Sequence, residues 1–154
     1  ASPRAAFYAK SLSFHGLPIR ESKEVDDTAL VEAWGRLYLM LHAMPNALAN
    51  LVEAGAELHL IGKDQGTSDL PENWHWKGRL YEGTQTIDER TRGTGGRFAS
   101  CGEENLLGLA GDRYSDRDIC IHETAHTLLQ YGLGGELRQR VVERIVGELG
   151  ARAA

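Results

Sequence analysis

The chain has 154 residues, which is long enough for one domain with a hydrophobic core of its own. Its formal net charge is −5 and charges of both signs are interspersed, so no basic stripe suggests a nucleic-acid partner. No apolar run is long enough to cross a bilayer, and we expect no membrane span. The start at Ala1-Ser2-Pro3, without an initiator methionine, favours a processed, secreted or extracytoplasmic protein.

The first part of the chain predicts two helices and one clear strand. Residues 1–23 show no clear period, apart from a short strand expected at 12–15. An acidic cap followed by apolar residues at helical spacing predicts a long amphipathic helix over 26–44. A short second helix is expected through Val52, capped by Asn46 and stopped by Gly55. The run 57–61 predicts a strand that leads out of that turn.

The middle of the chain is rich in loops and turns. Residues 92–96 are dense in glycine, and short strands are expected at 86–87 and 97–99. The run Trp74-His75-Trp76 suits either a contact platform for a sugar or peptide or a buried aromatic core, of which core is the commoner role.

The last part of the chain predicts two helices joined by a glycine hinge at 132–135. The first helix has a serine cap at Ser115 with an acidic residue three positions later, and it ends at Gly132. The second helix is expected over 136–149, because apolar residues recur there at four-residue steps.

The pentapeptide His122-Glu123-Thr124-Ala125-His126 lies inside the first of these two helices. Histidines four residues apart lie on the same side of a helix, so both imidazoles can hold one Zn²⁺ ion. Glu123 can then reach a metal-bound water without being a ligand, as a general base must. The apolar residues Ile121, Ala125 and Leu128 predict a core-facing stripe beside the histidine pair.

This H-E-x-x-H pattern resembles the zincin metallopeptidases. The resemblance implies an α+β, zincin-like fold: a small twisted sheet with an N-terminal helix, the active-site helix, and a C-terminal helix. It implies one domain over 1–154, with a helix and sheet part at 1–114 and the two last helices at 115–154. In such a fold an edge strand of the sheet lines the cleft and binds the substrate as an added strand.

The function implied by the resemblance is zinc-dependent endopeptidase activity on a protein or peptide substrate. His122 and His126 would hold Zn²⁺ as the cofactor, and Glu123 would be the catalytic base. Two alternatives remain open: a catalytically weak or inactive binding module of zincin shape, and a zinc hydrolase that acts on a substrate other than a peptide.

The third zinc ligand is left open by the sequence. No histidine follows His126, which excludes the metzincin pattern and leaves a gluzincin-like one, with a glutamate from a later helix. The downstream carboxylates are Glu136, Glu143 and Glu148. A hairpin through the glycine hinge would bring Glu143 nearest to His126, yet Glu143 lies opposite the apolar stripe of its own helix. The other possibilities are an upstream aspartate, Asp112 or Asp116, in what we favour as a capping loop, or a segment that this chain lacks.

Four further features carry open or structural interpretations. Cys101 and Cys120 either form a disulfide or remain as buried thiols. The run Glu103-Glu104-Asn105 either supports the metal-binding histidines through hydrogen bonds or forms a polar turn. Tyr131 is expected to pack, and the scattered histidines are expected to be structural or exposed: His15, His42 and His59.

Overall fold

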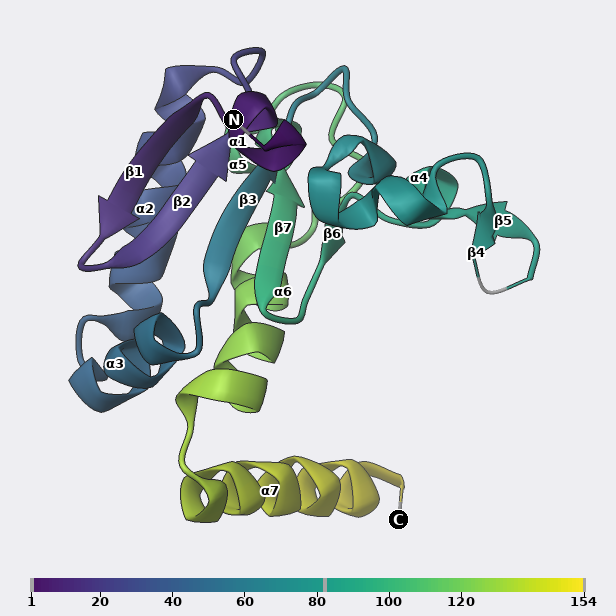
Figure 1. Ribbon diagram of the computed structural model, residues 1–154. Helices are drawn as coiled ribbons and strands as arrows, with labels where there is room; N and C mark the ends of the chain where they lie inside the picture. Colours follow the sequence, from purple (N-terminus) through teal and green to yellow (C-terminus); the bar gives the residue numbers. More distant parts are fainter. Residues whose placement is uncertain (1, 82, 154) are drawn as a thin grey trace.

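The computed structural model describes residues 2–81 and 83–153 and has an α+β architecture. A five-stranded mixed sheet has the strand order β1-β2-β3-β7-β6. Helices α2 and α6 pack on one face of this sheet, α2 against β1 and β2 and α6 against β7 and β6 (Figure 1). The expected α+β class with a small sheet is confirmed.

The sheet combines a hairpin, a parallel centre and a short antiparallel edge. β1 (Lys10–Phe14) and β2 (Leu17–Glu21) form the hairpin. β2, β3 (Glu57–Ile61) and β7 (Phe98–Gly102) are parallel neighbours. β6 (Gly93–Thr94) pairs antiparallel with β7, Gly93 opposite Cys101, and ends the sheet. A separate two-stranded hairpin consists of β4 (Leu80–Tyr81) and β5 (Gln85–Thr86).

The helices fall into a few long elements and several single turns. The longer helices are α2 (Asp27–Leu41), α3 (Pro45–Glu53), α6 (Ile119–Thr127) and α7 (Gly135–Ala153). The shorter ones are α1 (Pro3–Phe7), α4 (Ile87–Arg90) and α5 (Glu103–Leu106), with the 3₁₀ turns η1 (Thr67–Asp69) and η2 (Pro71–Trp76). A π-helical turn, η3 (Leu128–Gly132), continues α6.

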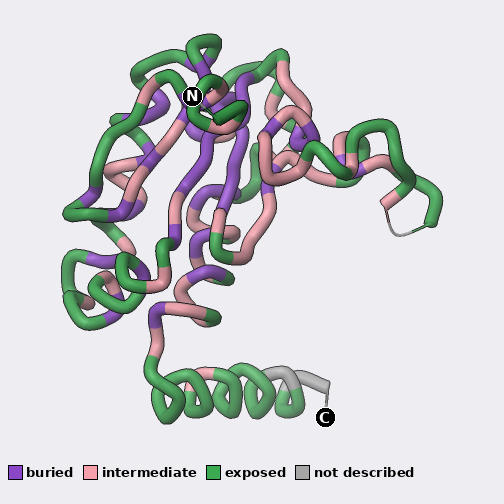
Figure 2. The backbone as a smooth tube through the Cα atoms, in the orientation of Figure 1, coloured by how far each residue is buried: buried purple, intermediate pink, exposed green. Residues whose placement is uncertain are grey.

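The hydrophobic core lies between the sheet and its helices. Leu58 and Leu60 of β3 and Ile19 of β2 are at most 1% exposed, and they pack with Leu37 and Leu41 of α2. Full burial of such a side chain stabilises the fold by about 1.5–3 kcal/mol. Alternation along β3 sends His59 to the opposite face of the sheet. Figure 2 shows the buried residues concentrated in these central strands.

Most periodic segments fold as the sequence predicts. α2 follows the expected cap at Asp26, and β3 has the expected bounds. α3 begins two residues earlier than expected, because its N-cap is Met44 rather than Asn46 and Pro45 occupies the first position of the helix. Strands β2, β4 and β6 were not predicted. β2 follows a tight turn at His15 and Gly16, both with positive φ.

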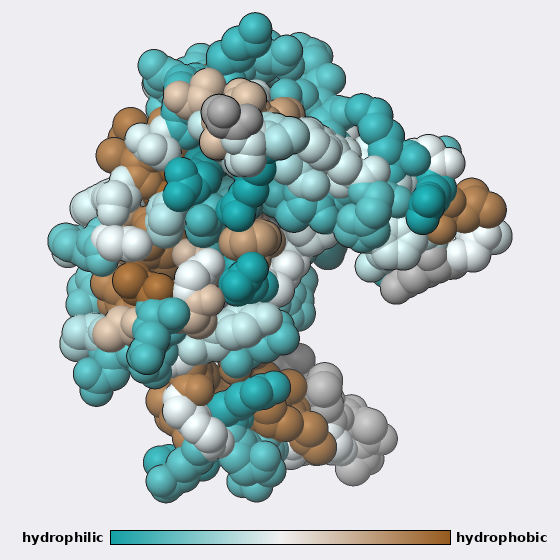
Figure 3. Space-filling view, viewed as in Figure 1, coloured by the Kyte–Doolittle hydropathy of each residue, from teal (hydrophilic) through white to brown (hydrophobic). Residues whose placement is uncertain are grey.

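The last helix forms as expected, but it does not fold back over the sheet. α7 lies across the end of η3, apart from the sheet (Figure 1). Its apolar side chains Leu137, Ile145 and Val146 are 45%, 48% and 62% exposed, and they form a visible apolar surface (Figure 3). The apolar stripe of this helix therefore does not face the core within the described part of the chain. None of the helices in that part has the length and apolarity needed to cross a membrane.

Candidate active site

Asp118, and not Ser115, caps the helix that carries the two motif histidines. The Asp118 carboxylate accepts from the Ile121 N–H at 2.9 Å and from Arg36 Nε of α2 at 2.7 Å. The side-chain oxygen of Asn105 accepts from the Ile119 N–H at 2.8 Å. These acceptors satisfy N–H groups that have no partner inside the helix, so the first turn of α6 is fixed from two directions.

The side of α6 that packs against the sheet carries small side chains rather than the expected apolar stripe. Cys120, Thr124 and Thr127 are at most 3% exposed, whereas Ile121 and Ala125 are only half-buried. Small residues let the helix approach β6 and β7 closely. The prediction of the buried face is therefore wrong by about one residue, while the flanking position of the histidines is confirmed.

His122 and His126 face each other across one turn of α6. Their Nε2 atoms are 3.3 Å apart, and both side chains are exposed. Two nitrogens that each lie about 2.0–2.1 Å from a tetrahedral zinc ion are separated by about 3.3–3.4 Å. The spacing of this donor pair therefore fits two positions of a tetrahedral Zn²⁺ site.

The glycine-dense segment, expected to be a loop, contains strand β6 and lies directly on α6. A Cβ atom at Gly93 would lie 2.6 Å from the Ser100 carbonyl oxygen and 2.7 Å from Ile119 Cγ2. A Cβ atom at Gly95 would lie 2.8 Å from His126 Cβ. Because such contacts are too close for real side chains, only glycine lets the edge strand run this near to the motif.

Glu123 lies beneath this strand and is half-buried. Burial raises the pKa of its carboxyl above the ordinary value, and the neighbouring His122 and His126 partly oppose this shift. A carboxylate whose proton affinity is raised is better suited to accept a proton from water.

A cleft of about 540 Å³ opens beside the motif. His122, Glu123 and His126 line one side, and Gly93, Gly95 and Gly96 line another. Its remaining walls include two aromatic and two basic side chains: Tyr81, Tyr114, Arg90 and Arg117. The three motif residues thus meet at a concave surface bordered by the edge of a sheet.

The candidate third ligands lie on α7 and in the loop before α6; Glu136 is exposed, and the other four have local partners. Glu143 accepts from Gln139 and Glu148 pairs with Arg144, both on the exposed surface of α7. Asp112 accepts from the Tyr114 N–H at 2.9 Å, which supports the capping-loop interpretation, and Asp116 pairs with Arg117. Within residues 2–81 and 83–153, no group of three or more His, Cys, Asp or Glu side chains is placed to hold a metal.

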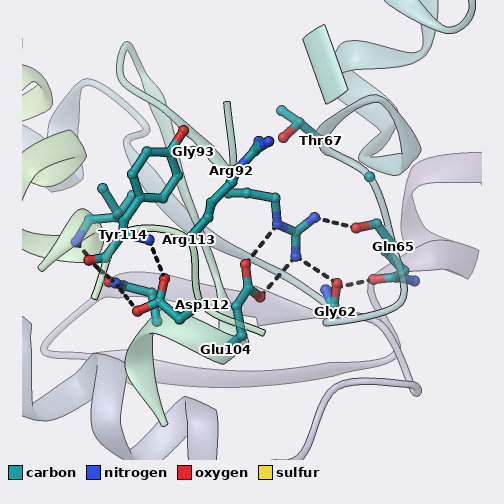
Figure 4. Close-up of polar contacts among 12 residues, drawn as sticks. Gly62, Gln65, Thr67, Arg92, Gly93, Glu104, Asp112, Arg113 and Tyr114 are labelled. Atoms are coloured by element: carbon teal, nitrogen blue, oxygen red, sulfur yellow. Dashed lines mark hydrogen bonds and ion pairs between the residues drawn. The ribbon is translucent and has the colours of Figure 1, made fainter. Parts of the chain in front are cut away.

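The acidic run before α6 supports the loops rather than the histidines. Glu103 accepts from the Asp26 N–H, and Asn105 caps α6. Glu104 forms a forked ion pair with Arg92, at 2.7 and 2.9 Å, and the side chains of this pair are only 7% and 12% exposed (Figure 4). Arg92 also donates to the carbonyl oxygens of Gly62 and Gln65. This anchor was missed because an arginine before a glycine run has no periodic signal.

Both cysteines are free and buried in this structure. The neighbouring Cys120 thiol and complete burial raise the pKa of Cys101 well above its usual range.

Tyr131 packs against the core as expected. The core interpretation is wrong for Trp74, which is 44% exposed, whereas Trp76 packs edge-on against Tyr81 of the cleft, with ring centres 4.9 Å apart.

A second polar cluster, here called the His59 cluster, lies on the opposite face of the sheet. His59 Nε2 lies 2.7 Å from Glu57 Oε2, and its Nδ1 contacts Glu72 and the Tyr8 hydroxyl. Burial disfavours a charged His59 ring, but the hydrogen bonds to Glu57 and Glu72 outweigh it and raise its pKa. Burial also opposes ionisation of Glu57, yet hydrogen bonds from His59 and Arg20 lower the pKa of Glu57 to about 2.

His59 is therefore structural, as expected, while the other two scattered histidines, His15 and His42, are exposed.

Comparison with known proteins finds no matching protein-family model, no matching curated protein and no matching solved structure. The residues and the geometry of the cleft therefore carry the functional assignment.

Proposed function

We propose that the protein is a zinc-dependent metalloendopeptidase of the zincin type, gluzincin-like in that it lacks a third histidine. The observation that carries the proposal is the Nε2 pair of His122 and His126, 3.3 Å apart, with Glu123 between them in sequence and β6 beside them. His122 and His126 would hold the ion. Bound Zn²⁺ would supply a Lewis acid for the scissile carbonyl and lower the pKa of a water toward about 7.

The chain's own residues divide the remaining work. Glu123 accepts the proton of the attacking water and passes it to the leaving amine, so that the peptide C–N bond breaks as the new C–O bond forms. β6 ends the sheet, and its glycines leave room for an extended peptide backbone close to α6. The substrate class that fits this arrangement is an unfolded or extended polypeptide.

One observation favours a second candidate, a zincin-shaped binding module with weak or no activity. The described residues offer two histidine ligands and no third protein ligand close to them. A two-ligand site holds zinc more weakly than the usual three-ligand catalytic site. This candidate predicts a folded protein that binds extended peptides without cleaving them.

Two measurements on the same sample separate the candidates: zinc content by elemental analysis, and cleavage of an unstructured peptide library followed by mass spectrometry. The endopeptidase should contain about one zinc per chain and cleave peptides internally. Glu123→Gln should keep the zinc and lower kcat by about 10²–10⁴-fold, because the amide cannot accept the proton. A matched control, Glu143→Gln, changes an exposed carboxylate of α7 and should leave both measurements unchanged.

Zinc without turnover in the parent protein would favour the binding module. Full turnover in Glu123→Gln would contradict the role of Glu123. Cleavage of non-peptide esters or amides alone would point to a different zinc hydrolase.

A further inference from the structure

Strand β6 is short, and it is held to β7 by backbone pairing and by the hydrogen bond between the Thr94 and Ser100 hydroxyls, which are 2.8 Å apart. Three of the four residues from Gly93 to Gly96 are glycines, which pack little and have the largest backbone freedom in the unfolded chain. The strand nevertheless has to lie within van der Waals contact of Ile119, Glu123 and His126 on α6. Pairing with β7 fixes the register of β6, and contacts at the two ends of the segment add to what fixes its distance from α6.

The two ends are held from different sides. At the far end, the Thr127 hydroxyl of α6 donates to the Gly96 carbonyl oxygen. At the near end, the residue before the strand is Arg92, whose side chain makes four hydrogen bonds to three partners (Figure 4). Two of these partners, Gly62 and Gln65, follow β3, and the third, Glu104, follows β7. Arg92 thus ties the edge strand to the carboxyl ends of two neighbouring parallel strands.

Stability alone is a weak reason for such an anchor. Replacing a buried ion pair with apolar residues of similar volume is often neutral or stabilising, because desolvation of the charges offsets their attraction. What an apolar pair cannot reproduce is the planar fork of Arg92, which fixes direction as well as distance.

We propose that Arg92 is a positioning residue of the cleft: through Glu104, Gly62 and Gln65 it sets the height of β6 above Glu123 and His126. The inference rests on the proposed function, since it concerns how the substrate-binding edge is aligned with the general base. A substrate strand paired to a displaced β6 would place its carbonyl away from Glu123, and a displacement of about 1 Å costs catalysis about 100-fold.

The test compares three variants with the parent protein. Arg92→Met combined with Glu104→Met removes the fork without leaving a lone buried charge. Arg92→Lys keeps the charge but offers no fork. Arg20→Met is the matched control, because Arg20 also forms an ion pair with a half-buried glutamate, Glu57, on the opposite face of the sheet.

The measurements are the melting temperature, the zinc content, kcat and KM on fluorescein-labelled unfolded casein, and amide hydrogen exchange of a peptide covering 91–97. In the double variant we expect a similar melting temperature and zinc content, and exchange at 91–97 that is about tenfold faster. We expect kcat/KM to be lowered about 10- to 100-fold, mainly through kcat, because the carbonyl is misaligned with Glu123. Arg92→Lys should lie between the double variant and the parent. Arg20→Met should change neither the exchange at 91–97 nor kcat/KM.

A double variant with the parent's exchange and kcat/KM would overturn the proposal. If the double variant does not fold, Arg92→Lys decides by the same readouts, and a lysine variant indistinguishable from the parent overturns the proposal as well. If the parent does not cleave casein, the proposed function fails, while the exchange measurement still reports whether Arg92 holds β6.

Discussion

Two histidine clusters lie on opposite faces of the same sheet, and they differ in how completely their polar atoms are paired. His59 is fully buried, with carboxylates or a hydroxyl at both ring nitrogens. The Nε2 atoms of His122 and His126 are exposed and face each other. Two such nitrogens cannot both be neutral acceptors in contact without a proton or a metal to share. Saturated partners indicate a structural role, whereas converging donors that lack other partners indicate a ligand site.

Removing one motif histidine should have the largest effect on zinc binding and activity. His126→Ala should lose zinc and activity together, because one of the two assigned ligands is gone. The variant should unfold at nearly the same urea concentration as the metal-free parent, since His126 is exposed. Elemental analysis after dialysis against a weak chelator checks the first expectation, and stoichiometric zinc in the variant would place the metal elsewhere.

The opposite pattern is expected in the His59 cluster. His59→Gln leaves the Glu57 and Glu72 carboxylates, each about 15% exposed, without their shared cation. Removing one partner of a buried ion pair typically costs about 3–5 kcal/mol of unfolding free energy. Urea unfolding measures the loss. Zinc content and kcat of the folded fraction should stay at the parent's level, and a loss of zinc would contradict the separation of the two clusters.

A smaller effect is expected in the pH dependence of stability. The raised pKa of His59 means that the folded state binds its proton more tightly than the unfolded state does. This stabilisation is complete below about pH 6.5 and is lost as the pH rises through the folded-state pKa. The slope should not exceed about 1.4 kcal/mol per pH unit for one group.

Unfolding free energies of the parent and His59→Gln between pH 5 and 9 test this expectation, and their difference should shrink as the pH rises. Glu21, whose pKa burial raises to about 7, adds a loss of the same sign between about pH 4.5 and 7 in both proteins. A constant difference across the range would show that His59 is neutral when folded.

The smallest effect is expected at the carboxylates of α7. Glu143→Ala should leave the zinc affinity unchanged, because Glu143 is exposed and accepts from Gln139 within its own helix. Glu136→Ala and Glu148→Ala serve as matched comparisons. Competition titration against a chelator measures all three, and a selective loss in Glu143→Ala would mean that α7 folds back over the histidine pair in solution.

Sequence reasoning succeeded where a physical signal repeats along the chain. Apolar residues at helical spacing identified α2, and the four-residue spacing of His122 and His126 identified their shared side of α6. It failed at β6, because glycines carry no hydrophobic pattern and the need for them comes from residues on α6. Arg92 precedes β6 and Glu104 lies in α5, so no local pattern could pair them.

The bare backbone of β6 has a consequence for how discrimination between substrates could evolve. Under the proposed function, an edge segment this rich in glycine holds a polypeptide mainly by its main chain and does little to distinguish one sequence from another. Tyr81, Tyr114 and Arg117 line the same cleft from separate segments, so under the proposed function the choice between substrates would depend on them. Substitutions at these three positions would change which substrate sequences the cleft prefers, while the histidine motif and the glycines of 93–96 stay constant. Substrate recognition and chemistry can therefore diverge independently.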